Sequence, residues 1–133
     1  MAREWVDHTS ELELHVRATS PAGAVTEATE ALGEILGEPD QDAEPVSRPL
    51  EVQARDPAGL LAAWLEEVVF LAEHDALIAR SARDLELAGE RLRGRVLAVP
   101  GRPSNLVKAV TYHRLALEAV DDGAWRGRVV LDV

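Results

Sequence analysis

The sequence predicts an α+β fold in which two helices pack on a mixed, mostly antiparallel sheet, with the element order β-α-β-α-β-β-β-β. Three observations lead to this prediction: strictly alternating apolar residues in several stretches, helical apolar spacing in two others, and turn residues between them. Two helices cannot cover both faces of a large sheet evenly, so both are expected in one layer. With 133 residues and a 47% hydrophobic fraction, residues 1–133 are expected to form a single domain.

Residues 11–18 are predicted to form the first strand. Charged and apolar residues alternate there, so one face should be buried; its residues are Leu12, Leu14, Val16 and Ala18. Pro21 opens the first helix, and Gly37 stands where a helix stop is expected. The apolar residues between them recur at helical spacing; they are Val25, Ala28, Leu32, Ile35 and Leu36.

Residues 38–49 are predicted to form an exposed loop, because they contain three prolines and four acids and little apolar content. These acids are read as a solvated charge run. A second strand over 50–55 then leads to Asp56 and Pro57, a helix N-cap followed by proline at the first helical position. The second helix should be the core helix, since its apolar stripe is wide: Leu60, Leu61, Trp64, Leu65, Val68, Leu71 and Ala72.

Two hairpins are predicted for the rest of the chain. The first pairs residues 78–88 with 91–99 around Gly89 and Glu90, and the second pairs 106–120 with 125–133. Residues 100–105 are expected to interrupt the strands between the two hairpins.

The composition limits the possible functions. The 14 lysines and arginines against 24 aspartates and glutamates give a net charge of −10, which should repel polyanions and argues against strong direct binding of nucleic acid. A local basic patch, a basic protein partner or a cation held by carboxylates stays open. Cysteine is absent from the sequence, so a metal would need oxygen or imidazole ligands. Without a signal-like or membrane-spanning apolar run, we expect a soluble, cytoplasmic protein.

Three local features carry polar groups that could take part in chemistry. Asp7, His8 and Glu11 cluster before and at the first strand, where they could hold a hard cation or simply form a polar turn. Lys108 lies on a predicted central strand, as an exposed charge or as a point charge aimed at phosphate. At the other end, Asp132 and the carboxylate of Val133 lie together and would favour a cation, unless this end frays.

Together these features resemble the archease family. The motifs that carry the resemblance occur in order over nearly the whole chain: DHTSE before the first strand, DPAGLLAAWLEE in the second helix, VKAVTYH, and a final Asp-Val. The resemblance implies an accessory protein without intrinsic catalysis that activates an RtcB-type GTP-dependent RNA ligase, promoting its guanylylation and turnover in tRNA splicing or RNA repair.

The resemblance also implies a divalent metal site, for calcium or magnesium. Its ligands would be Glu11, Asp132 and the Val133 carboxylate, with Asp7 and His8 as weaker candidates and Lys108 as the ligase-activating residue. Where the family has Ala-Asp, this chain has Ser10-Glu11, and the longer side chain suits a flexible calcium site better than a tight magnesium octahedron. The family histidine before the strand lysine has no counterpart in residues 101–105.

Two other functions fit the same carboxylates. One is a stand-alone metal-dependent hydrolase or nuclease, which the net charge disfavours because it steers RNA away. The other is a structural interaction module whose metal site is vestigial.

Overall fold

The computed structural model describes residues 1–8, 10–120 and 122–133, without the side chain of His8. These residues form two helices and eight strands in the order β1 (Ala2–His8), β2 (Glu11–Ala18), α1 (Pro21–Leu36), β3 (Gly37–Pro39), β4 (Val46–Gln53), α2 (Pro57–Asp75), β5 (Leu77–Ala88), β6 (Arg91–Pro103), β7 (Ala109–Ala119) and β8 (Trp125–Asp132).

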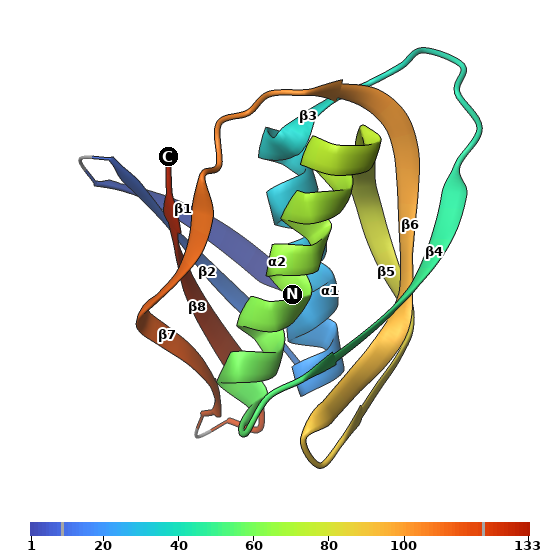
Figure 1. The fold of residues 1–133 in the computed structure, drawn as a ribbon. Helices are drawn as coiled ribbons and strands as arrows, with labels where there is room; N and C mark the ends of the chain where they lie inside the picture. The colour runs from blue at the N-terminus through green and yellow to red at the C-terminus, as the bar shows by residue number, and fades with distance from the viewer. Residues whose placement is uncertain (9, 121) are drawn as a thin grey trace.

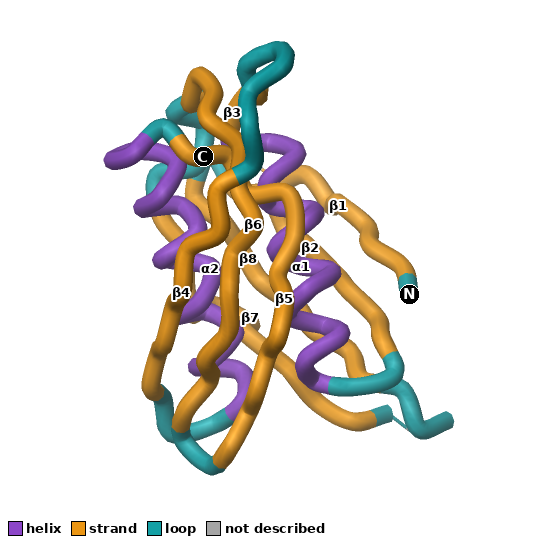
Figure 2. Tube along the Cα trace, turned by 90° about the vertical axis from the view of Figure 1, so that its right-hand side faces the viewer, coloured by secondary structure: helices purple, strands orange, loops and turns teal. Residues whose placement is uncertain are grey.

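The strands form two sheets with the helices between them (Figures 1 and 2). The first sheet has the order β1-β2-β8-β7, and in the second sheet β6 pairs with β3, β4 and β5. Every strand pair described is antiparallel. The predicted fold class and the predicted order of its elements are confirmed, although the strands divide into two sheets instead of one.

Several boundaries differ from the prediction. The chain has an additional strand, β1, which pairs along its length with β2. The predicted loop over 38–49 is shorter, because β3 occupies Gly37–Pro39 and β4 begins at Val46. The interruption predicted from residue 100 begins only after Pro103, where β6 ends. β1 pairs with its neighbour in sequence, β2. The other differences arise because β3 and β4 pair with β6, a strand distant in sequence, and this pairing outweighs weak local propensity.

Both helices begin where the sequence predicts, and α1 ends at the predicted Gly37. Ser20 caps α1 by accepting a hydrogen bond from the Gly23 amide at 2.9 Å, and Asp56 caps α2 by accepting one from the Gly59 amide at 2.7 Å. Each cap is followed by proline. The predicted apolar stripe of α2 is buried throughout, so this helix is the centre of the core.

Trp64 on α2 makes the main polar contact inside the core. Its indole Nε1 donates to the Thr29 hydroxyl on α1 at 3.1 Å, and that hydroxyl donates to the Val25 carbonyl at 2.7 Å. Trp64 and Thr29 are completely buried. The two helices are thus joined by a satisfied polar pair within apolar surroundings.

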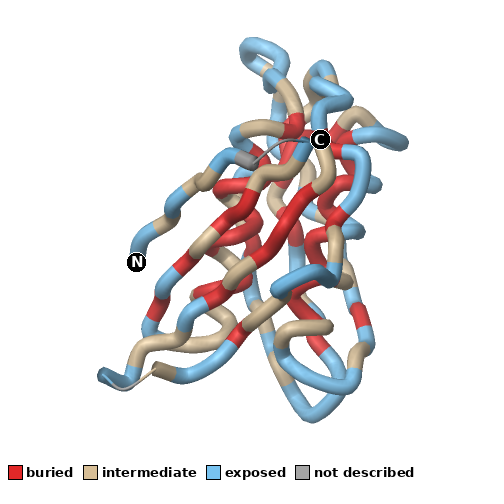
Figure 3. Tube along the Cα trace, turned by 90° about the vertical axis from the view of Figure 1, so that its left-hand side faces the viewer, coloured by how far each residue is buried: buried red, intermediate tan, exposed pale blue. Residues whose placement is uncertain are grey.

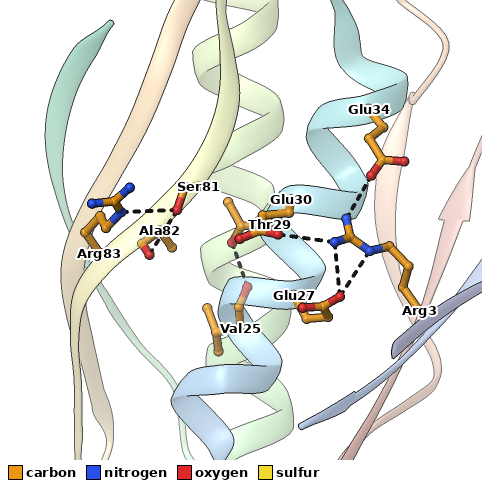
Figure 4. A network of polar contacts seen from close by, with 9 residues as sticks. All are labelled: Arg3, Val25, Glu27, Thr29, Glu30, Glu34, Ser81, Ala82 and Arg83. Carbon is orange, nitrogen blue, oxygen red and sulfur yellow. Dashed lines mark hydrogen bonds and ion pairs between the residues drawn. The ribbon is translucent and has the colours of Figure 1, made fainter. Parts of the chain in front are cut away.

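Arg3 fastens the outer strand β1 to α1. Its guanidinium reaches three glutamates one helical turn apart, Glu27, Glu30 and Glu34, at distances of 2.8 to 3.2 Å (Figure 4). Residues spaced in this way lie on one helix face. Glu27 is buried, and its charge is compensated by Arg3.

The first sheet turns one face to the helices and the other away from them. Positions that face the helices are buried, and the positions between them are mostly more exposed, with Glu13 and Val130 as buried exceptions (Figure 3). Leu14, Val16, Val129 and Leu131 belong to the core, whereas Glu11, Glu13 and Asp132 alternate with them. The side chains of Glu11, Glu13 and Asp132 therefore lie on the outer face of the first sheet. Within the described residues, neither helix has the length and apolar character needed to cross a membrane.

Candidate metal-binding site at one end of the first sheet

Glu11 and Asp132 lie directly opposite each other in the ladder between β2 and β8. Opposed residues of an antiparallel pair place their side chains on the same face, with Cβ atoms about 4.5–5.5 Å apart. The two carboxylates, from opposite ends of the chain, are therefore neighbours on the outer face. Both residues are half-buried.

The row through this pair continues across the whole sheet. His8 of β1 is the register partner of Glu11, and Ala109 of β7 is the register partner of Asp132. The side chain of His8 lies outside the described part of the structure. Asp7 pairs with Leu12, one row further on, and strand alternation puts its side chain on the opposite face from Glu11.

Backbone hydrogen bonds order the chain around the acid pair. The Val133 amide donates to the Ser10 carbonyl at 3.1 Å, and the Lys108 amide donates to the Asp132 carbonyl at 2.8 Å. Val133 is therefore held beside Ser10, just before the start of β2. The predicted pairing of the last strand with the segment before it is confirmed, and β8 pairs on its other side with β2, which places Asp132 opposite Glu11.

The prediction that Lys108 lies on a central strand is wrong. It comes just before β7, and β7 lies at the edge of the first sheet because β8 enters between β2 and β7. Its side chain is exposed and lines a groove with residues of α2. The backbone of Lys108 therefore contacts Asp132, while its side chain lines the groove beside α2.

Sequence analysis missed a second charged group on the same face. Glu13, only 6% exposed, has its Oε2 2.5 Å from His15 Nε2 and its Oε1 2.5 Å from Arg114 Nη2. Strand alternation alone puts Glu13 and His15 on the face of Glu11. Arg114 could not be found in this way, because it belongs to an irregular segment of β7 between Thr111 and Ala116 and has a φ of 54°.

The far end of the outer face carries ion pairs that are exposed. Arg17 bonds to Asp122 and Arg126 to Glu118. The Ala124 amide and, more weakly, the Arg17 guanidinium hold the pKa of Asp122 below its ordinary value of 3.8. The acids of Glu11 and Asp132 therefore lie at one end of this face, and arginines become more frequent toward the other.

The donor set at the acid end fits a hard divalent cation in part. Two carboxylates and nearby main-chain oxygens are ligands that calcium and magnesium prefer. Within residues 1–8, 10–120 and 122–133, however, nowhere do three or more His, Cys, Asp or Glu side chains gather as a metal-binding group. The described residues supply an incomplete shell, which water or a partner would have to complete.

The fold and this site define a small α+β protein that carries two neighbouring carboxylates, Glu11 and Asp132, at one end of a sheet. Residues 4–133 match the model of the archease protein family, and this chain belongs to that family. It is similar to the protein archease of Methanopyrus kandleri, with 31% identity over the full length of both chains. It is also similar to the protein archease of Pyrococcus abyssi, with 23% identity over 98% of this chain and 97% of the relative.

Two solved structures share the fold. The solution structure of Methanobacterium thermoautotrophicum protein 1598 has a TM-score of 0.71 and 23% identity, covering 98% of both chains. The crystal structure of an archease from Thermotoga maritima, described as a possible chaperone, has a TM-score of 0.66 and 18% identity, covering 100% of this chain and 98% of the other. The resemblance to archeases noted from the motifs is confirmed.

Proposed function

We propose that this protein is a non-catalytic accessory protein, located in the cytoplasm, that activates an RtcB-type GTP-dependent RNA ligase during tRNA splicing or RNA repair. It would promote guanylylation and turnover of the ligase. The observation that carries the proposal is the opposition of Glu11 and Asp132 at an open end of the first sheet, in a chain that belongs to the archease family.

The carboxylates of Glu11 and Asp132 and a main-chain oxygen of Val133 are the proposed ligands of a calcium or magnesium ion. A divalent cation neutralises phosphate charge during guanylate transfer. The ladder fixes the backbone of the two residues relative to each other, so only side-chain freedom is lost when they bind an ion. Because the site opens at the surface, a docked ligase can complete its coordination.

Electrostatics support a protein partner over direct recognition of RNA. The net charge of −10 repels a polyanion, and the carboxylates of Glu11 and Asp132 place negative charge at the proposed site itself. A ligase active site that binds GTP and RNA ends must itself be positively charged. The acid end of the first sheet complements such a surface.

The proposal is tested by following guanylylation of the purified ligase from the same organism, with this protein added at less than stoichiometric amounts. We expect faster guanylylation and repeated turnover, and no RNA joining or cleavage by this protein alone. Equal ligase rates with and without the protein would refute the proposal. Divalent-dependent RNA hydrolysis by the pure protein would favour a hydrolase instead.

The metal component is tested separately by calorimetric titration with calcium and with magnesium. We expect binding of a single ion, tighter for calcium, because the longer Glu11 side chain suits a flexible coordination shell. Activation of the ligase without measurable binding of either ion would identify the protein as an interaction module.

A further inference from the structure

The exposed side of α2 carries one large apolar side chain among acids. The solvent-facing residues near its carboxyl end are Glu66, Glu67, Phe70, Glu73, His74 and Asp75. Phe70 is 50% exposed and stacks on His74, with ring centroids 4.5 Å apart. Glu66, Phe70 and Glu73 follow the spacing i, i+4, i+7, so they form one stripe along the helix.

This stripe forms one wall of a groove with a volume of ≈ 270 Å³. The residues that line it are Glu66, Val69, Phe70, Glu73, Lys108, Ala109 and Val110. The opposite wall is the start of β7, at the edge of the first sheet. Because Ala109 is the register partner of Asp132, the groove begins next to the pair of Glu11 and Asp132 in the candidate metal site.

Tyr112 extends the aromatic surface beyond the groove. Its side chain, on β7, is 60% exposed and interacts with Glu66 of α2. Partial burial, followed by the charge and the side-chain hydrogen bond of Glu66, raises the pKa of the Tyr112 phenol above its ordinary value of 10.0. Two exposed aromatic rings, Phe70 and Tyr112, therefore lie close to carboxylates.

We propose that the groove between α2 and β7, defined by Glu66, Phe70, Glu73, Lys108 and Ala109, is a docking surface for an arginine-bearing segment of the ligase. This inference rests on the proposed function, since it supplies the surface on which the ligase would bind. The groove is separate from the outer face that carries Glu11 and Asp132. The two regions adjoin at Ala109, which lines the groove and is the register partner of Asp132.

The chemistry of the groove selects arginine. A guanidinium stacks on an aromatic face and at the same time donates paired hydrogen bonds to a carboxylate, which a lysine ammonium does less well. Phe70 offers the ring, and Glu66 and Glu73 lie one turn to either side of it on α2. Among the lining residues, the two carboxylates outnumber the single ammonium of Lys108, so the groove is net negative and favours a cationic segment over a phosphate backbone.

Binding of the purified ligase to the full chain, measured by calorimetry at low and moderate salt, tests the inference. We expect Phe70→Ala to weaken binding by about tenfold or more, as truncation of a central aromatic anchor does. Glu66→Gln combined with Glu73→Gln should weaken it by about tenfold and reduce its dependence on salt, because two attractive charges are removed.

Two matched controls have side chains outside the groove lining. Glu67→Gln removes one charge from the same helix, and Leu106→Ala truncates another exposed apolar residue, which is 42% exposed. Both should bind the ligase as the parent protein does. Circular dichroism and thermal unfolding establish that each variant is folded, and the glutamine variant provides the test if Phe70→Ala does not fold.

If the parent protein activates and binds the ligase, but the Phe70 and glutamine variants bind as tightly as the parent, the docking inference is overturned and the proposed function stands. If the parent protein neither binds nor activates the ligase, the proposed function fails and the docking inference fails with it. Selective loss of affinity in the groove variants, with both controls intact, supports the inference.

Discussion

Glu11 and Asp132 are direct partners in the β2–β8 ladder, so two carboxylates from opposite ends of the chain share one row of the first sheet. The ladder sets the separation of their Cβ atoms, and hydrogen bonds from the Val133 and Lys108 amides hold the adjacent backbone. Two neighbouring carboxylates repel each other unless a cation or a proton neutralises them. This relationship leads to the first prediction.

Asp132→Asn keeps the size of the side chain and removes one of the two charges. We expect affinity for calcium to fall by about tenfold or more, because the number of charged ligands sets calcium affinity over several orders of magnitude. Stability without metal should stay the same or rise slightly, since repulsion with Glu11 is relieved. Calorimetric titration and thermal unfolding measure the two effects.

Asp84→Asn is the matched control for this substitution. Asp84 is an exposed acid on β5 with a φ of 56°, a backbone conformation that asparagine tolerates well. It should leave calcium binding and ligase activation unchanged. If Asp132→Asn binds calcium and activates the ligase as Asp84→Asn does, the metal ligands have been assigned incorrectly.

Thr29→Val should destabilise the fold by removing the hydroxyl that accepts from Trp64. The indole N–H would then lack its partner in a fully buried position, at a cost of about 1–3 kcal/mol in the free energy of unfolding. Urea denaturation measures this change. Thr29→Ser retains the acceptor and loses only a methyl group, so a larger loss for serine than for valine would contradict the interpretation.

Gly33→Ala should be strongly destabilising, because α1 approaches β5 too closely for a side chain. A Cβ atom at this position would lie 2.0 Å from the Ala79 carbonyl oxygen, and that oxygen belongs to backbone that cannot easily move. Overpacking of this kind costs about 1–3 kcal/mol or more. Denaturation of Gly33→Ala should therefore occur at a lower urea concentration, while Glu67→Ala, at an exposed helix position, should denature like the parent. Equal midpoints for all three proteins would show that the helix can shift away.

Asp122 should titrate below its ordinary pKa of 3.8, because the Ala124 amide and the Arg17 guanidinium favour the ionised carboxylate. A lowered pKa in the folded protein stabilises it above the ordinary pKa, and this contribution is lost as the pH falls through the folded value. Nuclear magnetic resonance titration measures this pKa directly. Arg17→Gln should raise it only in part, since the Ala124 hydrogen bond remains; a midpoint above 3.8 in the parent would contradict the assignment.

Much of the fold is encoded locally. The alternation in residues 11–18 places Leu14 and Val16 in the core, and the apolar stripe of α2 is buried as predicted. Ser20 and Asp56 cap the helices by short-range hydrogen bonds that depend only on neighbouring residues. These features can be read from a single sequence because side-chain period and capping act within a few residues.

The candidate site was predictable only in part. Glu11 and Asp132 were selected from motifs, and the β2–β8 register brings them together. Metal binding by these residues stays a prediction, as do the parts assigned to Asp7, His8 and Val133. Lys108 was predicted to lie on a central strand, but it precedes the edge strand β7, since the order of strands in a sheet depends on pairing between distant segments and not on local pattern.

The sequence by itself determined the secondary structure of the core elements, the acidic character of the surface and the family, because composition, periodicity and ordered motifs are properties of the linear chain. Only the tertiary structure decided that β7 lies at the edge of the first sheet and that the bulge at Arg114 brings its guanidinium to Glu13. It also decided that Phe70 lines a groove beside Lys108. These outcomes depend on which distant strands and helices meet, and contacts between residues far apart in sequence leave no periodic signal in the chain.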